Sequence, residues 1–255
     1  MGYELKKLTV GGILDWGIQI LGEHFGTLFQ IKACTVLPSS IILGIQAHAM
    51  ERDESAATLL LYIAVVLFHS LVVAPLSHAA VLSLVSRSYL GHSTTLGESF
   101  ELGKRRLGPL IVTGIMTFIV ILGGTLLFII PGILCAIWFS LVEEVTLLER
   151  CDGAAALGRS KALIQKNMGT AILLGIVIVA IAIPLNLIAG LFPAPLDLLI
   201  SAMIACGLGM LSGCVWSVFY FACRCDDEGF GAETLAQEIG VEHPGKDGIS
   251  SDRAE

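Results

Sequence analysis

Charge is the scarcest property of this sequence. Only 15% of its 255 residues are Asp, Glu, Lys or Arg, whereas soluble domains carry about 25%. In contrast, 55% of the residues are hydrophobic and the mean hydropathy is +0.83. Because a water-soluble core cannot absorb this much apolar surface, the composition excludes an ordinary soluble domain and predicts that lipid is the solvent.

A basic face is also missing, which disfavours nucleic acid as a partner. The net charge is −7, and its source is residues 226–255, where nine acidic residues face only Lys246 and Arg253. Such a segment is typical of a solvated tail. We expect an acidic cytoplasmic tail over 226–255, with a short helix over 231–240. Beyond about residue 241 we expect disorder, because few apolar residues remain to pack.

Signatures of catalysis and of metal binding are absent as well. The chain contains no HExxH, no GxSxG and no phosphate-binding glycine loop. His69 and His78 fall in one expected helix, but a separation of nine residues places them on opposite faces. The spacing of Cys223 and Cys225 is too short for a zinc site on its own. The sequence therefore predicts no catalytic residue, no metal site and no cofactor, and a protein that is not an enzyme.

Long apolar runs, by contrast, are abundant. Spanning a bilayer takes about 20 apolar residues, and six runs qualify: 25–47, 57–86, 108–130, 131–149, 169–192 and 197–223. We expect them to form one six-span domain over residues 1–225. Only Pro131-Gly132, a turn dipeptide, separates the third run from the fourth, which predicts a tight hairpin there.

The loops between these runs carry their basic residues on one side of the membrane. Arg52 is the one exception. Because loops rich in Lys and Arg stay in the cytoplasm, we expect both termini to be cytoplasmic and the protein to lie in the cell (inner) membrane. The basic residues on the expected cytoplasmic side, outside the tail, are Lys6, Lys7, Arg87, Lys104, Arg105, Arg106, Arg150, Arg159, Lys161 and Lys166.

The segments 9–25, 95–107 and 152–168, which precede the odd-numbered spans, have amphipathic helical patterns. Each ends in a hydrophobic-Gly pair, and the second opens with a capping box formed by Thr95 and Glu98. Such helices are expected to lie in the membrane interface. We predict an all-α integral membrane protein with six transmembrane helices, built as three units of an amphipathic interfacial helix plus a transmembrane hairpin. Alternatively, the three loops are amphipathic without any repeat.

Three charged residues fall inside the spans: Lys32 in the first, and Glu143 and Glu144 in the fourth. Counted from the span ends at 1.5 Å per residue, all three lie about 8–9 Å deep. An unpaired charge there costs roughly 2.5–3.5 kcal/mol, so we predict that one carboxylate forms a structural ion pair with Lys32. In the alternatives, Lys32 and the two carboxylates reach the interface separately, or the carboxylates form a proton or solute site.

Small residues recur at every fourth position of the sixth span. Such ridges allow helix backbones to approach closely in lipid. We expect this ridge to pack within the chain, with a homodimer seam as the alternative. Its members are Ser201, Ala205, Gly209, Gly213 and Ser217.

Two stretches are similar to a known family. One, over 131–169, joins a Pro-Gly pair to a span ending in an apolar-Glu pair and to an Ala-rich segment with Arg-Ser. The other is FYFACRCDDEGF, residues 219–230, with Ala222 in place of the pattern's Asp. They resemble the membrane domain attached to some bacterial glycerophosphoryl diester phosphodiesterases, which also occurs alone in uncharacterised six-span bacterial proteins. The matching positions are Pro131, Gly132, Glu149, Arg159, Ser160, Tyr220, Arg224, Glu228, Gly229 and Phe230.

The resemblance implies a bacterial membrane protein but no chemistry, because the family's membrane part has no assigned activity. No segment outside the spans could form its phosphodiesterase domain, a barrel of about 250 residues. We expect an interaction or accessory protein in envelope or lipid biology whose partners are the lipid bilayer and, through the small-residue face of the last span, another protein or a second copy. The alternative is a small-solute or lipid transporter whose helices are broken at Pro38, Pro75 and Pro184.

Overall fold

The structure is a computed structural model that describes residues 8–53, 55–193 and 195–240. These residues are almost entirely helical and include no β-strand. The disorder expected beyond residue 241 falls outside them. In chain order the elements are α1 (Val10–Glu23), α2 (Phe25–Arg52), α3 (Ala56–Phe68), the π-helical η1 (His69–Val73), α4 (Ala74–Tyr89), α5 (Leu96–Leu127), α6 (Ile129–Trp138), α7 (Val142–Glu144), the π-helical η2 (Val145–Glu149), α8 (Ala154–Lys166), α9 (Met168–Ala189), α10 (Leu196–Glu228) and α11 (Ala232–Ile239).

Six helical stretches of the described chain are long and apolar enough to cross a membrane. Many of their large apolar side chains stay exposed, for example Leu60, Leu126 and Leu187. Such a surface is unfavourable in water, whereas lipid solvates it. The protein is therefore a multi-pass membrane protein, and the predicted all-α class with six transmembrane helices is confirmed. The stretches are 25–50, 56–89, 96–127, 129–149, 168–189 and 196–228.

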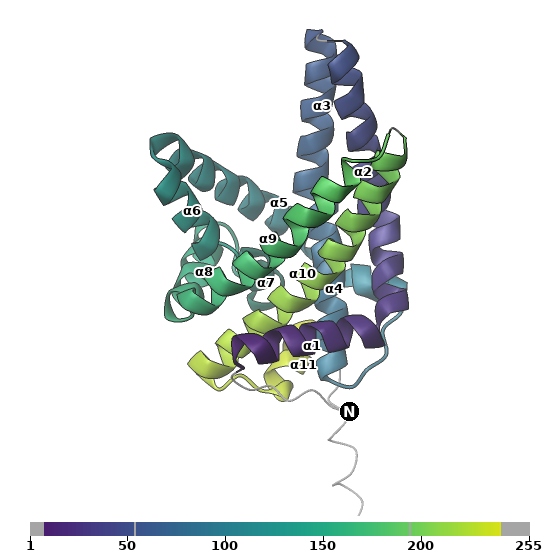
Figure 1. Cartoon of the computed structure of the whole chain (residues 1–255). Helices are drawn as coiled ribbons and strands as arrows, with labels where there is room; N and C mark the ends of the chain where they lie inside the picture. Colours follow the sequence, from purple (N-terminus) through teal and green to yellow (C-terminus); the bar gives the residue numbers. More distant parts are fainter. Residues whose placement is uncertain (1–7, 54, 194, 241–255) are drawn as a thin grey trace, which may run out of the picture.

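Helix α10 is at the centre of the bundle, where it packs against α1, α2, α4 and α9. The α5–α6 hairpin contacts α4 through α5 and leans away from the α2–α3 pair (Figure 1). Helix α1 crosses the foot of the bundle, at the end where α11 also lies (Figure 1). We call this foot, which carries α1, α8 and α11, the α11 end.

The most densely buried part of the chain lies toward the α11 end. Most side chains are buried along the second half of α4 and along η2, and the side chains of residues 217–224 in α10 are all buried. Helix α1 lies directly on α10 because Gly17 has no side chain: a Cβ atom there would sit 2.8 Å from Val215. Ile13 and Ile20, one turn away on either side, are fully buried on the same face. This end holds the bundle together, while the other end exposes its side chains to lipid.

The turn of the α5–α6 hairpin is at Phe128, three residues before the predicted Pro131-Gly132 turn. Pro131 instead lies in the first turn of α6, where a missing N–H costs no hydrogen bond. Gly132 faces α5, and any side chain at this position would collide with Thr125. The Pro-Gly pair thus starts a helix and allows a close helix contact, rather than forming the turn.

The three predicted amphipathic segments differ in the structure. Two of them form separate helices, α1 and α8, directly before α2 and α9. The segment 95–107 does not: after the Thr95–Glu98 capping box, α5 continues without interruption to Leu127. The boundary expected at Leu107-Gly108, between an interfacial helix and the third span, is therefore not a helix end, and Pro109 lies inside the continuous helix.

Candidate functional site

A buried polar cluster joins α2, α4 and α7 inside the bundle. Lys32 is 5% exposed, and its Nζ donates a hydrogen bond of 2.8 Å to the Ser77 hydroxyl. Glu144 is 1% exposed, and its Oε1 lies 3.0 Å from His78 Nε2. Oε2 of Glu143 lies 4.0 Å from His78 Nδ1. Ser77 and His78, which are adjacent in α4, thus bind charged side chains of two different helices.

The predicted ion pair between Lys32 and one carboxylate is not present as a direct contact. In the described part of the chain, Ser77 is the hydrogen-bond partner of Lys32, and His78 is the partner of Glu144. The reason is the position of α4, which contacts both α2 and α7. Lys32 reaches Ser77 along Gly209, where a Cβ would sit 3.3 Å from Lys32 Cε.

The carboxylates follow a break in the fourth span. Helix α6 ends at Trp138 and α7 begins at Val142. Ser160 of α8 compensates the interrupted backbone, because its hydroxyl donates to the Trp138 carbonyl at 2.8 Å and accepts from the Leu141 N–H at 3.3 Å. Oε2 of Glu144 is buried and has no hydrogen-bond partner among the described residues. The break therefore positions a carboxylate with one uncommitted oxygen inside the bundle.

A cavity of about 700 Å³ lies beside this cluster, between α3, η1 and α4 on one side and α5 on the other. We call it the lateral cavity. Its walls are mostly apolar, and Leu67 and Phe118 in these walls are exposed at the outer surface of the bundle, so the cavity opens toward lipid. Glu143 also lines it, with a side chain that is 38% exposed. The lateral cavity thus combines mostly apolar walls with one carboxylate.

Both π-helical segments border the lateral cavity. Ser70 and Leu71 of η1 and Thr146 of η2 contribute to its lining. Segments of this kind occur frequently at functional sites. In contrast, α2 and α9 continue through Pro38 and Pro184, so these prolines do not break their helices. The interruptions of the spans are at η1, next to Pro75, and in the fourth span.

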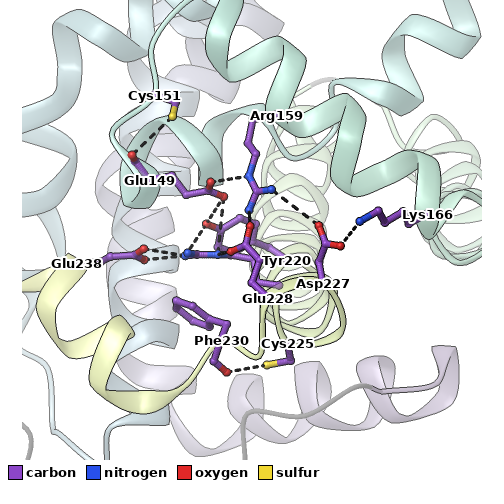
Figure 2. A network of polar contacts seen from close by, with 11 residues as sticks. Glu149, Cys151, Arg159, Lys166, Tyr220, Cys225, Asp227, Glu228, Phe230 and Glu238 are labelled. Atoms are coloured by element: carbon purple, nitrogen blue, oxygen red, sulfur yellow. Dashed lines mark hydrogen bonds and ion pairs between the residues drawn. The ribbon is translucent and has the colours of Figure 1, made fainter.

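A second polar cluster lies at the α11 end (Figure 2). Glu149 is its central acceptor: Oε2 lies 2.6 Å from Arg159 Nε, and Oε1 accepts from the Tyr220 hydroxyl at 3.0 Å. Arg224 donates to the two oxygens of Glu238 at 2.9 and 2.8 Å, and to the Tyr220 hydroxyl at 3.2 Å. These contacts tie η2, α8, α10 and α11 together.

Further ion pairs extend this cluster along the end of α10 (Figure 2). Arg159 also binds Glu228. Lys166, the last residue of α8, binds Asp227. The first residues of the predicted acidic tail therefore belong to α10 and its contacts, because each of these two carboxylates faces a cation of α8.

The turn after α10 places the Phe230 ring against the Arg224 guanidinium group. Gly229 ends the helix with a φ of 63°, a left-handed conformation that glycine adopts without strain. The chain reverses there, and the Phe230 ring lies 3.9 Å from the Arg224 guanidinium carbon. This cation–π contact holds α11 against the bundle.

The resemblance to the phosphodiesterase membrane domain selected residues that meet in space. The structure places Ser160 apart, at the break in the fourth span, and Pro131 and Gly132 at the α5–α6 hairpin. The remaining motif positions meet in the second polar cluster or its turn: Glu149, Arg159, Tyr220, Arg224, Glu228, Gly229 and Phe230.

The pKa values of Arg159 and Glu238 in this cluster are shifted by neighbouring carboxylates. Burial disfavours the charge of Arg159, but hydrogen bonds and attraction from Glu149 and Glu228 raise the pKa of its guanidinium. Burial raises the pKa of Glu238, and although Arg224 opposes this, the neighbouring carboxylates Glu149 and Glu228 add to it. The arrangement is that of a structural interlock, since each charged group already has a partner.

The small-residue ridge of α10 lies partly against other helices of the chain. Gly209 contacts Lys32 of α2, and Gly213 faces Val81 of α4, which a Cβ would approach to 2.9 Å. The Ser217 hydroxyl is buried and donates to the Gly213 carbonyl. Ser201 and Ala205, nearer the other end of α10, are only half-buried.

Two partners of the buried charges, Ser77 and His78, were missed by sequence reasoning. His78 was considered only as a metal ligand together with His69, which instead contacts Ser39 at 2.9 Å. The available signal was that His78 and Lys32 are both ionisable groups within spans. Among the described residues, no three His, Cys, Asp or Glu side chains could hold a metal ion.

The chain matches no protein-family model, no curated protein and no solved structure.

Proposed function

We propose that this multi-pass membrane protein is a non-enzymatic accessory protein that binds a membrane lipid in the lateral cavity. The observation that supports this proposal most is the lateral cavity itself, which has a volume of about 700 Å³, mostly apolar walls and Glu143 in its lining. The resemblance to the phosphodiesterase membrane domain supports a role in envelope or lipid biology in a bacterial inner membrane. The loop charges support cytoplasmic termini.

The physical argument starts from packing. Protein interiors are filled to the density of organic crystals, so a space of this size between apolar walls suits an occupant. Its volume falls within the range of about 300–1,000 Å³ found for ligand sites. In a bilayer the available apolar occupant is an acyl chain, whose burial there removes few polar contacts. The polar end of such a lipid would lie at Glu143, and its chain along α3 and α5.

Glu143 restricts the chemistry of the polar end. A carboxylate only accepts hydrogen bonds when ionised, and the contact to His78 at 4.0 Å is longer than a hydrogen bond. A lipid whose headgroup carries an amine or hydroxyl donor would satisfy it. This is the class of lipid that we assign to the lateral cavity.

The test is a substitution in the cavity wall whose larger side chain fills the lateral cavity. Gly114 lines it, and a Cβ there would have only Leu71 nearby, at 4.0 Å. In Gly114→Leu the new side chain is expected to occupy the cavity, and at least about tenfold less lipid should copurify. Gly123→Leu is the matched control, because Gly123 is on the same helix with nothing within 4 Å and does not line the cavity. Bound lipid is identified by mass spectrometry after purification in mild detergent.

Equal amounts of bound lipid in the wild type and in Gly114→Leu would refute the proposal. Loss of lipid in both variants would also refute it, since the control leaves the lateral cavity open. An amine-free, hydroxyl-free lipid as the specific occupant would leave the cavity assignment standing but overturn the role of Glu143.

A transporter is the second candidate, favoured by the interrupted fourth span beside Glu143 and Glu144. Discontinuous helices build substrate sites in many transporters. Reconstitution into liposomes distinguishes the two functions. Lipid scrambling or solute uptake that is abolished by Glu144→Gln favours transport, whereas stable lipid binding without flux favours the accessory protein.

A further inference from the structure

A second cavity, of about 460 Å³, lies at the α11 end between α4, α5, the residue after η2 and the end of α11. We call it the arginine cavity. It shares no lining residue with the lateral cavity, although α4 and α5 border both. Between the two cavities α4 and α5 touch, because a Cβ at Gly103 would sit 2.9 Å from both Ala79 and Leu76. The two cavities are therefore separate sites on one helix pair.

Four guanidinium groups from three elements line the arginine cavity: Arg87 of α4, Arg105 and Arg106 of α5, and Arg150. Three carboxylates line it too, and each already accepts a hydrogen bond, in one case from Arg105 of the same lining. Glu238 binds Arg224, Glu101 binds Arg105, and Glu98 accepts from the Thr95 N–H of its capping box. The lining thus has more cationic than anionic groups, and its carboxylates are committed.

Several N–H donors of these arginines have no hydrogen-bond partner among the described residues. Arg150 makes no hydrogen bond or ion pair with any residue that the structure describes. Among the residues that the structure describes, the Arg87 guanidinium pairs only with Glu98, at 3.9 Å, a distance longer than a hydrogen bond. Arg106 uses one terminal nitrogen for Thr146 O and Asp152, both at 3.0 Å, while its buried Nε has no partner among the described residues. Unused donors on a positioned arginine point to an anionic ligand.

The backbone at Arg150 adds a second observation. Its φ of 57° is the one positive φ of a non-glycine residue in the described chain. Left-handed backbone is unfavourable for a side chain as large as Arg, and such conformations concentrate at ligand sites. Here the chain leaves η2, and Arg150 is an exposed residue in the lining of the cavity.

We propose that the arginine cavity binds the phosphate group of a phosphate ester. Guanidinium groups match phosphate oxygens with paired, parallel N–H donors. The apolar side chains of Leu102, Leu147 and Ile239 line the same cavity and would contact the organic part of the ligand. Basic pockets between transmembrane helices bind anionic lipid headgroups in this way. The ligand is either the headgroup of a phospholipid in the adjacent leaflet or a soluble organic phosphate.

The test uses the full-length protein with two probes. In detergent, glycerol 3-phosphate is titrated while the Tm is followed by intrinsic fluorescence. In nanodiscs of phosphatidylcholine with phosphatidylglycerol, native mass spectrometry counts the phosphatidylglycerol molecules that stay bound. Arg150→Gln removes an exposed guanidinium without disturbing the core, and Arg150→Lys keeps the charge but removes the paired donors. Lys104→Gln is the control, because Lys104 is a cation at the same end of α5 that does not line the cavity.

We expect Arg150→Gln to weaken binding of the effective probe at least about tenfold, Arg150→Lys to weaken it severalfold, and Lys104→Gln to change it less than about twofold. A response to glycerol 3-phosphate identifies a soluble ligand, and a response to phosphatidylglycerol alone identifies a lipid headgroup. The proposal is overturned if neither probe binds saturably, or if Lys104→Gln weakens binding as much as Arg150→Gln. Because Gly114 lies in the other cavity, failure of lipid binding there leaves this result unaffected.

Discussion

Ser77 and His78 hold the buried charges of this protein. Lys32 and Glu144 are almost completely removed from solvent, at a depth where an unpaired charge is costly. Each has one neutral or titratable partner on α4 in place of a direct countercharge. Such hydrogen bonds to charged groups contribute about 1.5–3 kcal/mol each, so the identity of the partner is measurable.

A double-mutant cycle identifies the partner of Glu144. His78→Leu leaves the buried carboxylate without its hydrogen bond and should cost about 3–5 kcal/mol, whereas His78→Leu with Glu144→Met should recover most of this loss. We expect a coupling energy of at least about 1 kcal/mol between these positions, from unfolding in detergent. The control cycle combines Lys32→Met with Glu144→Met and should show weaker coupling, because these two side chains bind different residues of α4. A larger coupling energy in the control cycle than between His78 and Glu144 would instead support a direct ion pair between Lys32 and Glu144.

The fourth span is the element that deviates most from a regular helix. It consists of α6, a turn, α7 and η2, and a helix outside the span, α8, supplies the hydroxyl that bridges the turn. In lipid, unsatisfied backbone groups cost several kcal/mol, so non-helical backbone is tolerated only where protein supplies partners. Helix α8 is therefore part of the membrane fold, although its sequence indicates an interfacial helix.

Ser160→Ala tests this dependence. The variant leaves the Trp138 carbonyl and the Leu141 N–H without their shared partner, and we expect a loss of about 1–3 kcal/mol in unfolding free energy. Ser140→Ala is the control, since the Ser140 hydroxyl is buried in the turn without a hydrogen-bond partner among the described residues. Removing it should be neutral or slightly stabilising. If the two variants behave alike, the Ser160 hydroxyl does not support the break.

The whole molecule has two unlike ends. The α11 end combines the most densely buried segments, the second polar cluster and the arginine cavity. The far end consists of helix tips with exposed apolar side chains, such as Leu127, Phe128 and Leu191. Interlocking charges are stable where water and headgroups are near, whereas the far helix tips rely on lipid for solvation. This polarity fits an orientation with the α11 end in the cytoplasm.

Cysteine-accessibility labelling tests the orientation in a background without native cysteines. A membrane-impermeant reagent applied to intact cells is expected to label Cys introduced at position 53, in the α2–α3 loop, and not at position 104 or 161. Labelling at all three positions after lysis is the control. The topology is refuted by labelling of position 104 or 161 from outside.

The sequence by itself determined the fold class and the places where lipid replaces water. Apolar run length and the scarcity of charge suffice for this, because they act locally: each segment of about 20 apolar residues crosses the bilayer as a helix irrespective of its neighbours. The capping box at Thr95 is local in the same way, and it forms as its spacing indicates. The resemblance also selected residues that meet at the α11 end, without indicating how they meet.

Only the tertiary structure decided which helices are neighbours. Lys32 binds Ser77 because Gly209 of α10 and the position of α4 open that path, and Glu144 binds His78 because a break in the fourth span turns α7 toward α4. The arginine cavity likewise needs Arg87 and Arg150, which are 63 residues apart, on adjoining elements. Helix association in lipid has no hydrophobic drive and depends on close packing of specific surfaces. Such contacts join positions far apart in the chain, so the hydrophobic periodicity of the sequence does not predict them.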